Sequence, residues 1–163
     1  KVPPGRSMTY VFDTSPLSAL FRNYYPDIFK SLWAGFNALV TNEKILSTRE
    51  VLREIEDGSQ EALRNWAKVN KHIFPEPTAA EGQFVAKIFS VPHFQNNIEK
   101  RKLLRGGRVA DPFVIARAAV TGAAVVTMET FKPNASDIPN ICKHFEIPCL
   151  TLEEFMRSEG WSF

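Results

Sequence analysis

The sequence lacks any apolar run long enough to cross a bilayer, which takes about 20 consecutive residues. It also shows no N-terminal apolar segment of the kind that directs secretion. We therefore expect a cytoplasmic protein. Internal repeats and low-complexity tracts are missing as well, so we expect ordered structure, with disorder confined to the ends.

Cysteine and histidine are scarce. The two cysteines, Cys142 and Cys149, have no histidines at zinc-finger spacing and are expected to be buried free thiols. The three histidines, His72, His93 and His144, are scattered, and none pairs recognisably with a nucleophilic serine or cysteine. We assign them no catalytic role, so the chemistry has to come from other side chains.

The net charge of +2 is too small to indicate nucleic-acid binding by itself. One segment is nevertheless densely basic and ends just before Asp111. Its cations are Lys100, Arg101, Lys102, Arg105 and Arg108. They are candidates for binding RNA phosphates beside an acidic site. A solvated helix end running into a glycine turn explains the same segment equally well, and the sequence does not decide between the two.

A chain of 163 residues, 44% hydrophobic and 23% charged, is typical of one globular domain with a substantial core. We place that domain at residues 8–163. Residues 1–7, which carry prolines and a glycine before Met8, are interpreted as a remnant of the expression vector and excluded from the fold argument.

Hydrophobic periodicity predicts strands that alternate with helices. Strands are expected at residues 10–12, 44–47, 123–127 and 148–150, and helices at 15–25, 26–40, 47–57, 60–69, 78–89, 113–120, 138–145 and 151–156. Residues 91–107 are left unassigned. The alternation predicts an α/β fold, a parallel sheet of four or five strands with helices on both faces.

Two acidic residues follow predicted buried strands. Asp13 comes directly after the first strand, and Glu129 lies two residues beyond the strand at 123–127. The carboxyl ends of parallel strands are where open sheets bind ligands. Neighbouring carboxylates repel each other unless one is protonated or a cation lies between them. Mg²⁺ or Mn²⁺ suits such oxygen ligands.

A third acidic candidate lies on the helix predicted to begin near residue 47. Ser47 and Glu50 have the spacing of a capping box, so Glu50 is interpreted as part of the cap. Glu54 and Glu56 then border the apolar stripe of this helix on opposite sides. Periodicity does not choose between them.

The fourth candidate, Asp111, precedes Pro112 and the apolar helix at 113–120. Asp at the N-cap with Pro at the first helical position explains this pair without any catalytic role. Glu54 as a solvated helix residue and Glu129 as a loop charge are equally ordinary interpretations. Acidic candidates that each stand where a strand or helix begins or ends together suggest a metal-dependent phosphodiesterase.

In content and order, these segments resemble the PIN-domain nucleases, and more closely the VapC-like toxins. The matching segments are YVFDTS at 10–15, STREVLREI at 47–55, ADPFVIA at 110–116 and VVTME at 125–129. The likeness covers nearly everything from Met8 onward. Three further segments are similar to a PIN subgroup known as a domain of unknown function. They are IPNIC at 138–142, YYP at 24–26 and LW at 32–33.

The resemblance implies a role for each acid. It makes Asp13 the ligand of the first strand, Glu54 the helix ligand, in preference to Glu56, and Asp111 the third carboxylate. Glu129 stands where many relatives have aspartate, and its longer side chain would ligate through water or at a second metal.

Two hydroxyl residues are expected to support these acids. Ser15 occupies the position where relatives often carry asparagine, and Thr127 precedes Glu129 by two residues. Ser15 would offer its hydroxyl to a metal-bound water or a phosphate, and Thr127 would orient its neighbours in a similar way. A helix-cap or strand-end hydrogen bond is the structural alternative for both.

The implied function is a Mg²⁺- or Mn²⁺-dependent endoribonuclease, the toxin of a type II toxin–antitoxin pair. The implied partners are an RNA substrate, a cognate antitoxin and a second copy in a homodimer. The main alternative is a PIN scaffold that has lost catalysis and binds RNA or protein. A phosphatase with Asp13 as covalent nucleophile is disfavoured because Ser15 replaces the second aspartate that haloacid-dehalogenase-like phosphatases use.

Overall fold

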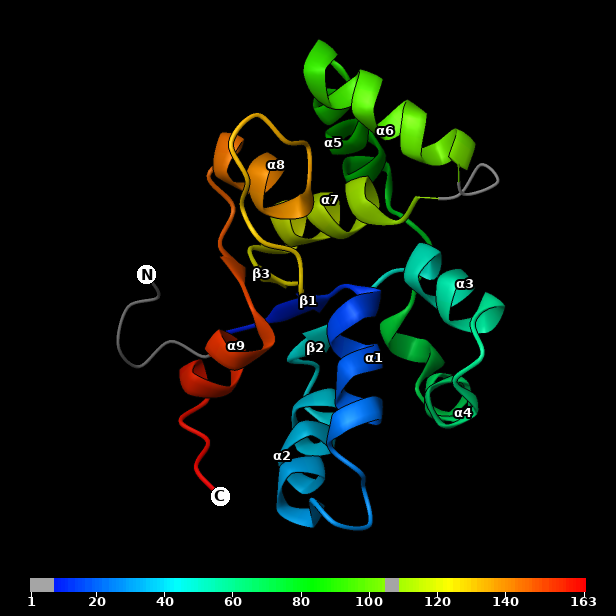
Figure 1. The fold of residues 1–163 in the computed structure, drawn as a ribbon, viewed down its shortest axis with the longest axis vertical. Coiled ribbons are helices and arrows are strands. Elements are labelled where there is room, and N and C mark those ends of the chain that lie inside the picture. Colours follow the sequence, from blue (N-terminus) through cyan, green and yellow to red (C-terminus); the bar gives the residue numbers. More distant parts are fainter. Residues whose placement is uncertain (1–7, 105–108) are drawn as a thin grey trace.

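The computed structural model describes residues 8–104 and 109–163 (Figure 1). Its sheet has four parallel strands in the order β2-β1-β3-β4. The strands are β1 (Tyr10–Phe12), β2 (Ile45–Leu46), β3 (Ala124–Val126) and β4 (Cys149–Leu150). The α/β class and the parallel sheet predicted from the sequence are confirmed.

Helices connect the strands and follow the last one. They are α1 (Thr14–Asn23), α2 (Lys30–Thr41), α3 (Arg49–Asp57), α4 (Glu61–Val69), α5 (Ala79–Phe89), α6 (Pro92–Leu104), α7 (Asp111–Thr121), α8 (Ile138–His144) and α9 (Leu152–Ser158). A short 3₁₀ turn, Lys71–Ile73, follows α4. No helix in the described part of the chain is long and apolar enough to cross a membrane.

Both faces of the sheet are covered because β1 is apolar on both sides. Tyr10 and Phe12 point to one face, where Phe155 of α9 lies against both rings and Phe36 of α2 against Phe12. Val11, also fully buried, points to the opposite face. There α7 packs on β1 and β3, and α5 packs on α7. Figure 1 shows α7 and α8 above the strands and α2 and α9 below them.

The parallel register brings all four carboxyl ends to one edge. Tyr10 pairs with Ile45 of β2 and with Ala124 of β3, and Val125 pairs with Cys149 of β4. Each return to a parallel neighbour requires a crossover, and the helices supply it. The segments that leave β1 and β3 therefore start side by side, which is the geometry needed to bring Asp13 and Glu129 together.

The start of α3 differs from the prediction. The N-cap is Thr48, whose side chain accepts the backbone N–H of Val51 at 3.2 Å. Ser47 is fully buried and donates its hydroxyl to the carbonyl of Phe12 at 2.8 Å. Glu50, expected to complete a capping box with Ser47, forms an ion pair with the preceding arginine at 3.1 Å. Ser47 therefore ties α3 to β1, and the cap lies one residue further on.

Other helix limits also shift. The helix expected at 26–40 begins only at Lys30, and the unassigned region 91–107 contains α6 as far as Leu104. Helix α7 starts at Asp111 itself, with Ala110 as its N-cap, so the prediction that Asp111 caps this helix is wrong. Asp111 lies in the first turn, where an acidic side chain interacts favourably with the helix dipole.

The two cysteines are free thiols, as expected, but they are not equally buried. Cys142 on α8 is buried, whereas Cys149 on β4 is half-buried. Although the two cysteines are not adjacent in the sequence, their side chains meet in the fold. A hydrogen bond with Cys149, and then burial, raise the pKa of the Cys142 thiol.

Candidate active site at the carboxyl edge of the sheet

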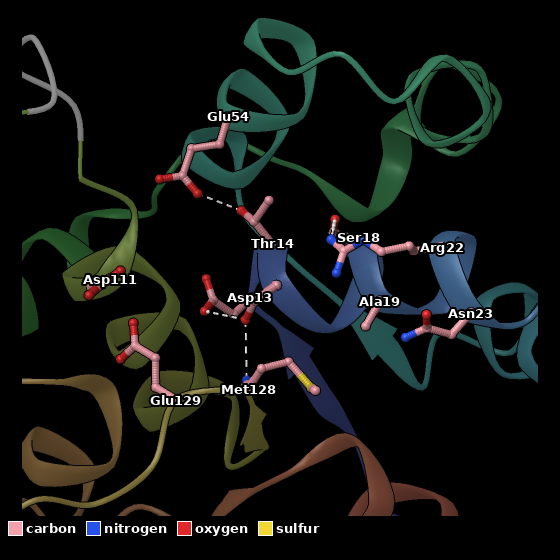
Figure 2. A pocket seen from close by; sticks show the side chains of 11 residues that line it. Asp13, Thr14, Ser18, Ala19, Arg22, Asn23, Glu54, Asp111, Met128 and Glu129 are labelled. Atoms are coloured by element: carbon pink, nitrogen blue, oxygen red, sulfur yellow. Dashed lines mark hydrogen bonds between the residues drawn. The ribbon is translucent and has the colours of Figure 1, made fainter.

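A cavity of about 520 Å³ opens at the carboxyl edge of the sheet, and all four predicted acids line it. Figure 2 shows their side chains around one space, each from a different part of the chain. Asp13 follows β1, Glu54 lies on α3, Asp111 begins α7, and Glu129 lies in the loop after β3. The fold thus gathers residues separated by up to 116 positions, from 13 to 129.

Asp13 is the most firmly positioned of the four. Its backbone N–H donates to the carbonyl of Val126 at 3.0 Å, which continues the β1–β3 pairing past the end of the strand. Its carboxylate accepts the hydroxyl of Thr127 at 3.0 Å and, more weakly, that of Ser15 at 3.4 Å. Ser15 also accepts the backbone N–H of Met128 at 3.2 Å. Both predicted supporting hydroxyls therefore contact Asp13 or its surroundings.

Glu54 and Glu56 lie in different environments. Glu54 lines the cavity and accepts the hydroxyl of Thr14 at 2.5 Å, an interaction that joins α3 to the first residue of α1 (Figure 2). Glu56 is exposed and lies outside the residues that line the cavity. The tertiary structure thus separates two glutamates that helical periodicity could not.

Asp111 is 3% exposed and has an internal counter-ion. Arg101 of α6 places one guanidinium nitrogen 2.6 Å from a carboxylate oxygen of Asp111. Its other terminal nitrogen donates to the carbonyl of Ser136 at 2.7 Å. Arg101 was expected to bind RNA phosphates, but here its guanidinium is engaged within the protein.

The rest of the predicted basic segment is divided. Lys100 and Lys102 are exposed on α6. Arg105 and Arg108 lie outside the described residues.

Glu129 has a structural contact in addition to its place in the cavity. Its carboxylate accepts the backbone N–H of Ile138, the first residue of α8, at 2.8 Å. Its own backbone N–H donates to the hydroxyl of Thr127 at 3.2 Å. Glu129 is therefore held at the rim between the β3 loop and α8.

The carboxylates perturb one another. Burial, followed by the charge of Asp111, raises the pKa of Asp13 from 3.8 to about 7, and Glu129 adds to the effect. Hydrogen bonds from the Thr14 backbone and the Thr127 hydroxyl partly oppose it. Burial and the charge of Asp111 likewise raise the pKa of Glu129. This concentration of negative charge would be relieved by a cation.

The chemistry of the donor set suits Mg²⁺ or Mn²⁺, which bind carboxylate oxygens. Among residues 8–104 and 109–163, however, no group of three or more His, Cys, Asp or Glu side chains could hold a metal ion as they stand. The donors fit the ion, and binding it would require side-chain rearrangement within the cavity.

Sequence reasoning missed the polar end of this cavity. Ser18, Arg22 and Asn23 of α1 line the same space as the acids. Arg22 donates to the hydroxyl of Ser18 at 2.7 Å. Ser15, Ser18 and Arg22 follow one another at helical spacing, so they share one face of α1. That spacing, counted from Ser15, was the available signal.

The fold and the site define an α/β protein with a carboxylate-lined cavity at the carboxyl edge of a parallel sheet. Residues 10–163 match the family described as "Domain of unknown function (DUF4411)", and the chain belongs to this family. No curated protein sequence matches the chain.

Among solved structures, the chain is similar to one in the crystal structure of VapBC2 from Rickettsia felis bound to a DNA fragment from their promoter. The TM-score is 0.47 at 15% sequence identity, and the match covers 88% of this chain and 98% of that one. The family description names no activity, so function must be argued from the site.

Proposed function

We propose that the protein is a Mg²⁺- or Mn²⁺-dependent endoribonuclease that hydrolyses phosphodiester bonds of RNA. The observation that carries the proposal is the meeting of Asp13, Glu54, Asp111 and Glu129 in one cavity. A binding site for a small neutral ligand would not need four carboxylates, two of which have pKa values raised by burial and then by neighbouring charges. The resemblance of the same segments to PIN nucleases supports RNA as the substrate.

In this proposal Asp13, Glu54 and Asp111 hold the ion. Glu129, already bonded to the first turn of α8, contributes charge and a water-bridged contact. The ion supplies Lewis acidity for hydrolysis of the phosphodiester. Thr127 and Ser15 orient the carboxylate of Asp13 through their hydroxyls.

Thr14 orients Glu54 by its 2.5 Å hydrogen bond. Other residues of the chain would bind the substrate. Arg22 provides a cation at the polar end of the cavity for a phosphate next to the scissile one. The exposed Lys100 and Lys102, together with Arg105 and Arg108, remain proposed contacts to the RNA backbone.

The proposed biological role is that of a toxin in a type II toxin–antitoxin pair. A cognate antitoxin would cover the acidic cavity, and a second copy of the chain would form a homodimer. Induced expression should then arrest growth, and co-expression of the product of the adjacent gene should relieve the arrest. Arrest that persists in a Glu54→Gln variant would separate toxicity from the cavity.

Cleavage is tested with purified protein and mixed RNA in Mn²⁺ or in EDTA. Glu54→Gln keeps the shape of the side chain and removes its charge, so cleavage should fall by more than about 100-fold. Glu56→Gln makes the same change on the exposed side of α3 and should cleave like the wild type. Equal cleavage by both variants, or full activity in EDTA, would refute the proposal.

A catalytically silent scaffold is the second candidate. The observation in its favour is that no three described side chains are placed as a ready metal site. A scaffold would bind RNA in EDTA and in Mn²⁺ alike and leave it intact with every divalent ion.

A further inference from the structure

A second cavity, of about 430 Å³, adjoins the acidic one. Glu129 lines both, so the two spaces meet at this residue. The second cavity lies between the loop after β3, α8 and the end of β4. Its surface is largely apolar, with contributions from Phe131, Pro139, Ile147 and Leu150. These side chains offer no oxygen donors, so this part of the cavity suits an apolar ligand surface.

The rim of this cavity combines an aromatic ring with a cation. Phe131 is 49% exposed although it is large and apolar. The ammonium of Lys143, on α8, lies 4.5 Å from the centroid of that ring. Such a cation–π contact holds the lysine beside the ring at the rim of the cavity.

Most of the polar groups in the lining already have a structural task. Thr151 and Glu154 form the capping box of α9, each accepting a backbone N–H of the other at 3.0–3.1 Å. Glu129 accepts the backbone N–H of Ile138, and Cys149 is hydrogen-bonded to Cys142. Thr130 and Lys143 are the other polar side chains in the lining. The cavity therefore offers an apolar floor, one aromatic wall and few directional polar groups, which favours a flat, mostly apolar ligand.

We propose that this cavity binds the base of the nucleotide beside the scissile phosphodiester. The inference rests on the proposed ribonuclease function and adds a substrate contact to it. Proteins that recognise RNA commonly take an unstacked base onto an aromatic side chain beside a cation. With its base against Phe131, a nucleotide has its sugar and phosphate near Glu129, at the entrance to the acidic cavity.

The consequence for the substrate is specific. A base can enter the cavity only if it has left its stack, so the cleaved position lies in a single-stranded loop, bulge or end. Lys143 would contact the phosphate or the polar edge of the base. Cleavage should therefore be faster in loops than in the same sequence held in a duplex.

The test uses uncharged nucleosides, so that the carboxylates do not repel the probe. Adenosine, cytidine, guanosine and uridine are titrated separately into the full chain in EDTA and followed by amide NMR. At least one should bind with a Kd on the order of 1 mM and shift signals around Phe131 and Lys143. Ribose, which lacks the base, should produce no such shifts.

Variants separate stacking from a change in folding. Phe131→Ala should weaken nucleoside binding about tenfold, whereas Phe131→Tyr, which keeps the ring, should bind like the wild type. Phe163→Ala removes another exposed ring, 70% accessible, that lines neither cavity, and is the matched control. Circular dichroism of each variant confirms an intact fold.

The outcomes distinguish this inference from the proposed function. Nucleoside binding that depends on Phe131, in a protein that cleaves no RNA, supports the base site and removes the catalytic proposal. Cleavage that depends on Glu54 while no nucleoside binds, or while Phe131→Ala binds nucleosides normally, overturns the base site and leaves catalysis standing.

Discussion

Replacing Asp13 by asparagine should stabilise the metal-free protein at neutral and alkaline pH, even though it removes a proposed ligand. Asp13 is 5% exposed, and its carboxyl group has a pKa of about 7 in the fold instead of 3.8. Burial and the charges of Asp111 and Glu129 cause this shift. Above pH 7 Asp13 is therefore ionised in both states, but its charge is unfavourable only in the folded protein.

The sign follows from linkage between protonation and folding. Below pH 3.8 the carboxyl group is neutral in both states, and the perturbation has no effect. Between pH 3.8 and 7 the unfolded chain ionises first, so wild-type stability falls as pH rises, and the full cost is present above pH 7. At 1.36 kcal/mol per pKa unit the upper limit is about 4 kcal/mol. Asparagine accepts weaker hydrogen bonds than a carboxylate, so we expect a net gain of about 1–3 kcal/mol at pH 8.

The assay is urea unfolding of the wild type and Asp13→Asn at pH 4.5 and pH 8 in EDTA. The variant should exceed the wild type at pH 8, and the difference should shrink at pH 4.5. Glu56→Gln, an exposed charge removal on α3, should show no such pH dependence. Added Mn²⁺ should raise the stability of the wild type and have a smaller effect on Asp13→Asn.

Two results would contradict an unfavourable charge at Asp13. One is an Asp13→Asn variant that is less stable than the wild type at pH 8 in EDTA, and the other is a difference between the two proteins that is the same at both pH values. Either result would mean that burial and the charges of Asp111 and Glu129 do not disfavour the ionised carboxylate of Asp13.

Three further predictions concern the surroundings of the site. Arg22→Gln should weaken RNA binding severalfold and lower the slope of log Kd against log salt by about 0.7, while Mn²⁺ affinity stays unchanged. An unchanged slope would contradict a phosphate contact. Arg101→Gln removes one counter-ion of Asp111, so calorimetry should show tighter Mn²⁺ binding, and the free energy of unfolding in EDTA should fall by about 1–3 kcal/mol. An unchanged Mn²⁺ Kd would contradict competition between the guanidinium and the metal. Ser47→Ala should lower the free energy of unfolding in urea by about 1–2 kcal/mol, because a buried carbonyl of β1 loses its hydrogen-bond donor. Ser59→Ala, at an exposed position, should have little effect, and equal effects of the two variants would argue against the buried hydrogen bond.

The local pattern of apolar residues was sufficient to predict most helices and strands but insufficient to place their ends. The apolar run before Asp13 predicted β1 at the residues where it occurs. The start of α3 was placed one residue early, because Ser47 and Thr48 are both good caps in sequence. Only the position of the Phe12 carbonyl decides which of them turns inward.

Some residues of the candidate site could likewise be predicted from the sequence, and others could not. The order of the acids in the chain was enough to nominate Asp13 and Glu129, since both follow buried strands. Glu54 could not be separated from Glu56 by periodicity, because the choice depends on where α1 places Thr14. Arg101 was nominated for RNA and is bound to Asp111, because α6 packs its last turns toward the start of α7. The sequence shows that a residue is charged but does not show which group it pairs with in the fold.

The sequence by itself determined the alternation of strands and helices, the parallel sheet and the strand ends at which acids stand, because these depend on short-range apolar periodicity. The tertiary structure alone decided that the acids share one cavity, that Arg22 faces it, and that an apolar cavity with Phe131 adjoins it at Glu129. These features depend on the crossover of helices between non-consecutive strands, which brings distant segments to the same edge of the sheet.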